Sequence, residues 1–400
     1  MQPGLTETVA FTIGALAVAL PVGIVAARLR IPYAVALVLV ALAITRAPAA
    51  ASASFSSIVL LVILPALVFE AAWKLDLDVL RRVAVPIAFL AIPGVLVTAA
   101  LVGGGLALSG QLPFASAALL GAIVAATDPI AVIATFRRLA VPAALATLIE
   151  GESLFNDGAA VVLYGVLVAA ATPSAHGAAT AVSLLPGPIM LRAIEESVGG
   201  IVLGFVTAVV VTLALRGTKE STLQIVATLV GAYGAYLVAD ELLHVSGIFA
   251  AVVVGLALRA FPHFPTTAED ATEIDRFWTV LAFLANSVVF LLLGLRIEIG
   301  RIVHEPWLVL TTLGLVVLAR LVLTYAGLPL LGFGGPRHRG WQHVTAIAGM
   351  RGALSLALAI ALPATIPQRP QIIDAVFGVV LVTLVVQVLA IGPLLKRLRL

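Results

Sequence analysis

The chain has 400 residues, of which 62% are hydrophobic and 11% are charged, whereas a soluble globular chain has about 45–50% apolar and about 25% charged residues. This composition excludes an ordinary water-soluble protein, because apolar runs recur along the whole chain and not in one segment. The net charge is only +3 and no basic arm is present, which argues against nucleic acid as a partner, while the lack of cysteine excludes disulfides and thiol-ligated metals.

Apolar runs of spanning length follow one another from the N-terminus to the C-terminus. A membrane-spanning helix needs about 20 mostly apolar residues, and by that measure we expect an all-α polytopic membrane protein with about thirteen spans in a single transporter domain covering residues 1–400. The expected spans lie at about residues 6–28, 31–46, 55–73, 81–109, 114–137, 142–171, 187–216, 220–239, 245–261, 276–297, 305–331, 339–363 and 371–395.

The segments outside these spans are short. The first apolar run lacks a basic n-region and a convincing cleavage site, so we expect it to be a retained span and not a signal peptide. The acidic run from Glu269 to Asp275 is expected to be a solvated loop, and no regulatory domain is expected after the last span.

Lys and Arg concentrate in the odd-numbered loops and after the last span. Positive residues favour the cytoplasmic side of a membrane, so we expect the N-terminus outside and the C-terminus in the cytoplasm. We expect the protein to lie in a cell membrane, namely the inner membrane of a prokaryote, with the lipid bilayer around it.

Polar residues interrupt the fifth and the twelfth expected spans. The interruptions are Ala126-Thr127-Asp128-Pro129 and Gly349-Met350-Arg351-Gly352, seven spans apart. We therefore expect two inverted six-helix repeats, at about 6–171 and 220–395, joined by a linking helix at about 187–216, with broken helices that cross at a binding site.

Thr127-Asp128-Pro129 has two interpretations. A simple proline kink is tolerated in membrane helices. However, a carboxylate at mid-membrane costs at least about 2.5–3.5 kcal/mol on insertion scales, and Pro129 leaves a carbonyl without its helical hydrogen bond. An unpaired carbonyl beside Asp128 and the Thr127 hydroxyl is typical of an oxygen-rich cation pocket.

The sixth expected span carries three carboxylates and an amide within the run from Glu150 to Asp157. Ser153 and Asp157 share one helical face, and Glu152 and Asn156 share another. The first face can present a hydroxyl and a carboxylate to an ion, and the second can form a hydrogen-bonded pair that supports it. The alternative is an extramembrane loop, which the long apolar flanks disfavour.

Two arginines in apolar spans need partners. Arg320 is expected to pair with Glu152, and Arg351 to face a carboxylate or a helix C-terminus, with interfacial snorkelling as its alternative. Glu70 is either an interfacial residue or an additional wall of the cation path.

Taken together, four motifs resemble those of the NhaP/NHE branch of the monovalent cation/proton antiporters: Thr127-Asp128-Pro129, Glu152-Ser153-Leu154-Phe155-Asn156-Asp157-Gly158, Ala319-Arg320 and Gly349-Met350-Arg351-Gly352-Ala353. The span count and the inverted halves extend the resemblance across nearly the whole chain. It implies that Asp157 alternately holds Na⁺ and a proton, with ion contacts from Asp128, Ser153, Thr127 and in some relatives the acid at Glu70. It further implies a supporting network of Glu152, Asn156 and Arg320.

The resemblance also carries expectations about transport. Asn156, where electrogenic relatives have a second Asp, implies electroneutral exchange of one proton for one cation. Spans four to six and eleven to thirteen are implied to form a mobile ion-transport bundle, and the other spans a homodimer interface. The long regulatory tail of many relatives is missing from this sequence.

Competition between a cation and a proton for one carboxylate is the mechanism that we expect, with alternating access. The partners are then monovalent cations (Na⁺, K⁺ or Li⁺) and protons, and neither a resident cofactor nor an enzyme activity is expected. Two alternatives remain: a sodium-coupled symporter of a small organic anion, and an intramembrane aspartyl hydrolase that uses Asp128 and Asp157.

Overall fold

The computed structural model describes residues 3–29, 33–44, 58–139, 141–172, 186–216, 218, 220–261, 264, 267–296, 300, 306–333, 339–349 and 351–398. Within these ranges the chain forms helices and no strand. In the same ranges, 8 helices are long and apolar enough to cross a membrane, and further apolar helices are 10–17 residues long. The expectation of an all-α polytopic membrane protein is therefore confirmed in its helical content and its spanning segments.

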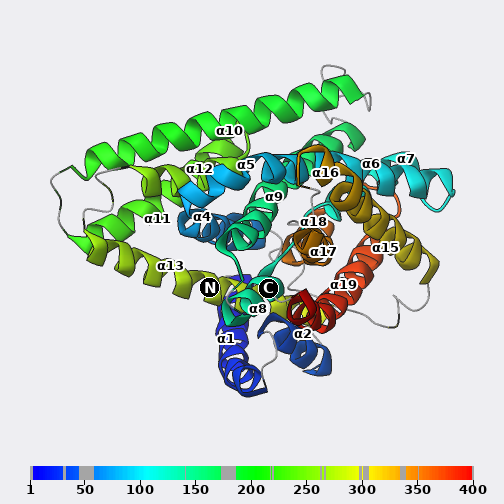
Figure 1. Cartoon of the computed structure of the whole chain (residues 1–400), viewed down its shortest axis with the longest axis horizontal. Coiled ribbons are helices and arrows are strands. Elements are labelled where there is room, and N and C mark those ends of the chain that lie inside the picture. The colour runs from blue at the N-terminus through cyan, green and yellow to red at the C-terminus, as the bar shows by residue number, and fades with distance from the viewer. Residues whose placement is uncertain are drawn as a thin grey trace.

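The helices follow one another along the chain (Figure 1), and three π-helical turns, named η2, η3 and η4, adjoin α4, α11 and α15. In chain order the elements are α1 (Pro3–Leu29), α2 (Tyr33–Ile44), η2 (Val59–Ile63), α4 (Leu64–Lys74), α5 (Leu77–Ala91), α6 (Pro93–Leu108), α7 (Phe114–Ile123), α8 (Ile130–Leu139), α9 (Ala143–Ala171), α10 (Pro186–Ala214), α11 (Ser221–Leu237), η3 (Val238–Leu243), α12 (Gly247–Ala260), α13 (Ala268–Arg296), α15 (Pro306–Leu321), η4 (Val322–Gly327), α16 (Leu328–Leu330), α17 (Arg339–Ala348), α18 (Ala353–Ala361) and α19 (Arg369–Leu398).

Both expected interruptions of spans are confirmed. The segment expected at 114–137 is divided into α7 and α8, and residues 124–129 between them are not helical. The segment expected at 339–363 is divided into α17 and α18, with residues 349, 351 and 352 outside either helix; Met350 lies outside the described residues. Proline lacks the amide hydrogen that a helix needs, and glycine is a poor helix former, so both breaks occur where the sequence weakens the helix.

The expectation of a solvated acidic loop at Glu269–Asp275 is wrong. Helix α13 begins at Ala268 and includes the whole run. Asp270 is buried and accepts a hydrogen bond of 2.5 Å from the Ser221 hydroxyl, and Asp275 accepts one of 2.5 Å from the Trp73 indole. Carboxylates in the first turns of a helix are stabilised by the helix dipole, which favours helix over loop when such partners are present.

The helices pack as two groups (Figure 1). In the first, α12 packs against α4, α10 and α11, and α13 packs against α2 and α4. In the second, α5 packs against α9, α6 against α7 and α15, and α19 against α15, α17 and α18. Helix α9 passes through the middle of the molecule and contacts α4, α10 and α12 across the boundary between the groups.

Large apolar side chains remain exposed on the outer faces of the helices. Helix α10 alone exposes Leu191, Ile194, Val198, Val202, Phe205 and Val210. A water-soluble monomer rarely exposes a continuous apolar face of this kind, whereas lipid solvates it well. The interior, in contrast, contains buried polar and charged residues, among them Glu152 and Asn156 of α9 and Arg320 of α15.

Candidate functional site

The two broken helices leave two C-terminal and two N-terminal helix ends inside the molecule. One charged residue binds the two C-terminal ends and another binds the two N-terminal ends. Backbone groups at a helix end have no partner within the helix, and their dipoles add a partial positive charge at the N-terminus and a partial negative charge at the C-terminus. Arg351 lies at the C-terminal ends of α7 and α17, and Asp128 lies at the N-terminal ends of α8 and α18.

The Arg351 guanidinium donates through Nε to the carbonyl of Val124, the C-cap of α7, and through Nη1 to the carbonyl of Gly349, which follows α17. Only 2% of Arg351 is exposed, so the alternative of interfacial snorkelling is wrong. The expectation of a helix C-terminus as its partner is confirmed for both broken helices.

The Asp128 carboxylate binds the two helix N-termini on the opposite side of the crossing. It accepts hydrogen bonds from the amide of Ile130 at 3.0 Å and from the amide of Ala353 at 3.3 Å. A Cβ at Gly352 would overlap the Asp128 side chain, so the bare glycine is what allows the carboxylate to come this close. Asp128 thus joins the two broken helices, a role that its sequence position alone did not indicate.

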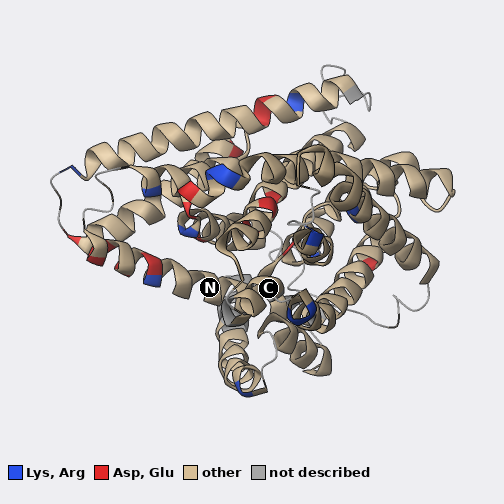
Figure 2. Ribbon diagram, in the orientation of Figure 1, with Lys and Arg blue, Asp and Glu red and all other residues tan. Residues whose placement is uncertain are grey.

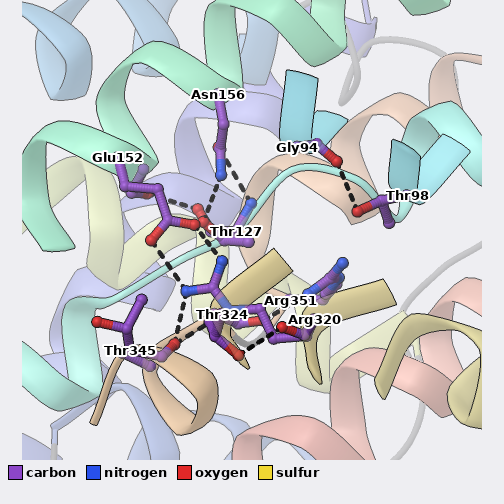
Figure 3. Close-up of polar contacts among 12 residues, drawn as sticks. Gly94, Thr98, Thr127, Glu152, Asn156, Arg320, Thr324, Thr345 and Arg351 are labelled. Carbon is purple, nitrogen blue, oxygen red and sulfur yellow. Dashed lines mark hydrogen bonds and ion pairs between the residues drawn. The ribbon is translucent and has the colours of Figure 1, made fainter. Parts of the chain in front are cut away.

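Helix α9 contacts the first break through two of its side chains. The Ser153 hydroxyl donates to the Thr127 carbonyl at 2.5 Å. Asn156 binds Thr127 twice, because its Nδ2 donates to the Thr127 hydroxyl at 2.5 Å and its Oδ1 accepts from the Thr127 amide at 3.2 Å. Figure 3 shows Asn156 pointing at Thr127, so its amide supports the break directly and does not pair with Glu152.

The expected ion pair between Glu152 and Arg320 is confirmed (Figure 3). Arg320 donates through Nη1 to Oε1 and through Nη2 to Oε2 at 2.9 Å, which makes the pair bidentate. Its Nε and Nη2 also donate to the Thr345 carbonyl in α17, at 3.0 Å and 2.6 Å. The pair therefore connects α9, α15 and α17 while 2% of Glu152 and 7% of Arg320 are exposed.

Asp157 differs from these residues because one of its oxygens is unpaired. Its Oδ1 is buried and has no hydrogen-bond partner among the described residues. Asp157 lies on the same face of α9 as Ser153, one turn away, and close enough to Asp128 for their charges to interact. An ionised carboxylate oxygen buried without a partner is unfavourable, so this position suits a cation or a proton.

Glu70 is not part of this hydrogen-bonded cluster. Its carboxylate forms an ion pair with Lys74 one turn further along α4, and Lys74 also donates to the Thr279 hydroxyl at 2.8 Å. The interpretation of Glu70 as an additional wall of the cation path thus remains a prediction.

Several polar residues of the site were not singled out from the sequence. Ser355 donates to the Ile123 carbonyl at 2.8 Å, Gln387 donates to the Ala348 carbonyl at 3.2 Å, and Thr383 accepts from the Arg351 amide at 3.3 Å. All three bind backbone groups at the helix breaks. The sequence signal that could have found them is a single polar residue in an otherwise apolar span, because such a residue is expected to face the bundle interior.

The Ser153 hydroxyl meets the Thr127 carbonyl where α9 passes the first break, next to Asp128 in sequence. Asp157 lies one turn further along the same face of α9. Hard cations prefer oxygen ligands of this kind. The surrounding charges, in contrast, are already bound to helix ends or to one another. Within this arrangement the Oδ1 of Asp157 is a buried carboxylate oxygen without a hydrogen-bond partner among the described residues.

The chain is similar in sequence to known sodium/hydrogen exchangers. The transmembrane sodium/hydrogen exchanger family matches residues 15–397. The Na⁺/H⁺ antiporter ApNhaP of Aphanothece halophytica is 37% identical over 344 residues, which cover 85% of this chain and 64% of that protein. The Na⁺/H⁺ antiporter NhaP of Pseudomonas aeruginosa is 34% identical over 359 residues, which cover 86% of this chain and 82% of that protein.

The fold has a solved counterpart. The structure of the sodium proton antiporter MjNhaP1 from Methanocaldococcus jannaschii at pH 8 superposes with a TM-score of 0.80, covering 99% of both chains at 24% identity. This likeness shows that the two chains share their fold from end to end.

Proposed function

This chain belongs to the sodium/hydrogen exchanger family, a family of multi-pass membrane transporters and not of enzymes, and on this premise we propose that it exchanges Na⁺ for H⁺ across a cell membrane. Relatives named as Na⁺/H⁺ antiporters support the proposal, although the chain spans only 64% of the length of the Aphanothece protein. The cation is a substrate of the reaction and not a resident cofactor. K⁺ and Li⁺ are the other monovalent cations to compare with Na⁺.

The observation that carries the proposal is the unpaired Oδ1 of Asp157. A carboxylate in this position is neutralised either by a proton or by a bound cation, and the two ions compete for it. Ser153, Thr127 and Asp128 would complete the cation's oxygen shell, since the Ser153 hydroxyl and the Thr127 carbonyl each retain a lone pair beside their mutual hydrogen bond.

We assign a supporting role to Glu152, Asn156, Arg320 and Arg351. Each of these side chains binds a backbone group or a charge on another element of the bundle. They hold the breaks of both crossing helices in place, so that the ion site does not depend on the cation for its shape. Glu70 has no assigned contact in the site, and we propose it only as a residue bordering the path.

The two groups of helices suggest how the site reaches both sides of the membrane. We propose about thirteen spans in two inverted repeats, with the N-terminus outside and the C-terminus in the cytoplasm. In this scheme α5–α9 and α15–α19 form the mobile bundle, while the remaining helices form the static part and the homodimer interface. Asp157 lies on α9, which contacts the static helices α4, α10 and α12, so a rocking movement of the bundle would change its access.

We also propose electroneutral exchange of one proton for one cation. Asn156 binds Thr127 through both its oxygen and its nitrogen and carries no charge, which leaves Asp157 as the exchanging carboxylate. The two earlier alternatives gain no support. The relatives are named as Na⁺/H⁺ antiporters and not as symporters, and Asp128 is bound to two backbone amides.

A reconstituted transport assay tests the proposal. Purified protein in proteoliposomes is given an acid-inside pH gradient, and uptake of ²²Na⁺ and collapse of the gradient are followed with Na⁺, K⁺ and Li⁺. We expect Asp157→Asn to abolish exchange, because the amide cannot bind a proton in place of a cation. The matched control is Asp78→Asn, whose side chain is 83% exposed on α5. Exchange by Asp157→Asn at the wild-type rate would overturn the assignment.

A clamped membrane potential tests the stoichiometry. With K⁺ and valinomycin setting the potential, the rate of an electroneutral exchanger does not change between zero and a negative interior. A rate that follows the potential would refute the exchange of one proton for one cation while leaving antiport itself intact.

A further inference from the structure

A cavity of about 540 Å³ lies between α9, α10, α12, α18 and the π-helical turn η3. It lies on the boundary between the two helix groups, because α9 and α18 belong to one group and α10 and α12 to the other. Its lining includes charged or titratable side chains of both signs: Arg192, Glu196, Asp240 and His244. None of them belongs to the site at the crossing helices.

The cavity continues the helical face that carries the ion site. Val161, Tyr164 and Gly165 of α9 line it, at four, seven and eight residues beyond Asp157. Residues at these spacings lie on the same side of an α-helix. The cavity is therefore reached from Asp157 by moving along one face of α9 toward its C-terminal end.

An apolar contact lies on α9 directly beside Asp157. The Phe249 ring of α12 lies against Gly158, where an added Cβ would come within 2.9 Å of the ring. Phe249 is buried, and so is its neighbour Ile248, which also lines the cavity. The close fit of the Phe249 ring on Gly158 leaves no room for a side chain between α9 and α12 at this point.

The charges of the cavity favour a cation only in part. Arg192 and Glu196 lie one turn apart on α10 and form an ion pair of 2.9 Å, Nε to Oε1 (Figure 2 shows the charged segments near one end of α10). Side-chain exposure is 47% for Arg192 and 19% for Glu196. Asp240 on η3 adds a second carboxylate to the lining. A cation that enters must therefore approach Glu196 against the repulsion of Arg192.

The proposed function implies that cations reach Asp157 through this cavity from the side of the membrane where α9 ends. Resting on that function, we propose that Arg192 lowers the apparent cation affinity on that side only. In the proposed topology this is the outer side. Glu196 holds Arg192 in place, so the ion pair acts as an electrostatic gate within the cavity. The opposite face of the protein is not affected by Arg192.

Thiol labelling tests access through the cavity directly, because the chain contains no native cysteine. Gly165 lines the cavity and has open space at its Cβ position, so Gly165→Cys should fold. We expect a positively charged, membrane-impermeant methanethiosulfonate to modify it from the side where α9 ends and to block exchange. The control is Gly314→Cys, another exposed glycine with open space at Cβ, which lies on α15 outside the cavity. Gly165→Cys that reacts no faster than this control, or reacts from the other side, would overturn the proposal.

Charge substitution tests the gate. Right-side-out and everted membrane vesicles present opposite faces of the exchanger, so the KM for Na⁺ can be measured on each side. We expect Arg192→Gln to lower the KM by about two- to threefold on the side where α9 ends, the factor for one unit charge a few ångströms away across water. Glu196→Gln should raise it on the same side, and neither change should alter the KM on the other face.

The control is Arg81→Gln, which removes an arginine from another ion pair within one helix, outside the cavity lining. If the wild-type protein exchanges ions but Arg192→Gln changes the KM for Na⁺ equally on both faces, or not at all, the proposed role of Arg192 is overturned. Absence of Na⁺-dependent proton exchange in the wild-type protein would instead overturn the proposed function.

Discussion

Removing one partner of the Glu152–Arg320 pair should destabilise the protein strongly, and the structure indicates by how much. Both side chains are buried, the pair is bidentate, and Arg320 also binds the Thr345 carbonyl. Loss of one partner from a buried ion pair costs about 3–5 kcal/mol, because the other charge remains buried without compensation. At roughly 2 °C per kcal/mol for a large chain, the unfolding midpoint would fall by about 6–10 °C.

The two single variants should not be equivalent. Arg320→Ala leaves a carboxylate, which can take up a proton, whereas Glu152→Ala leaves a guanidinium, which cannot lose its charge. We therefore expect Glu152→Ala to be the less stable of the two. Thermal unfolding in detergent, followed by intrinsic fluorescence, measures the midpoint, with the exposed Arg81→Ala as control because its ion pair with Asp78 is solvated and contributes little.

A double variant separates coupling from general damage. Glu152→Leu combined with Arg320→Met removes both charges and keeps much of the side-chain volume, so it should unfold at a higher temperature than either single substitution. If the losses in the two single variants simply add in the double variant, the pair does not stabilise the protein as a pair, and the reasoning is refuted.

Two further substitutions test the crossing helices. Gly352→Ala should displace the Asp128 carboxylate, at a cost of about 1–3 kcal/mol for overpacking. It should lower the exchange rate more than the control Gly104→Ala, because nothing lies within 4 Å of a Cβ at Gly104. Equal exchange rates of the two variants in the proteoliposome assay would refute this expectation. Asn156→Asp keeps the acceptor for the Thr127 amide and adds a second titratable carboxylate beside Asp157, so exchange should become dependent on the membrane potential; a rate independent of the clamped potential would contradict this expectation.

Local sequence signals predicted much of the fold and part of the site. Hydropathy located the helices, and Pro129 and Gly349 located the breaks, because both effects depend only on neighbouring residues. The Glu152–Arg320 pair was also predictable, since each charge lay within an apolar span and needed a partner there.

The contacts that depend on helix crossing could not be derived in this way. Asp128 binds an amide of α18, and Arg351 binds a carbonyl of α7, each more than two hundred residues away in sequence. Nothing in the neighbouring residues specifies such partners. The prediction of a loop for the acidic run at the start of α13 was wrong for the same reason. Its buried Asp270 accepts a hydrogen bond from a hydroxyl of α11, and the local composition does not reveal this partner.

The unpaired oxygen of Asp157 separates transport from stability, and this gives the Asp157→Asn variant a second readout. Substitutions in the supporting network remove bonds that hold helices together, so they should lower the unfolding midpoint together with transport. Asp157→Asn removes no hydrogen bond of Oδ1, and it removes a buried negative charge close to Asp128. We therefore expect its unfolding midpoint to equal or exceed that of the wild-type protein while exchange is lost. A large fall in the midpoint would mean that Asp157 belongs to the supporting network and that the exchanging carboxylate lies elsewhere.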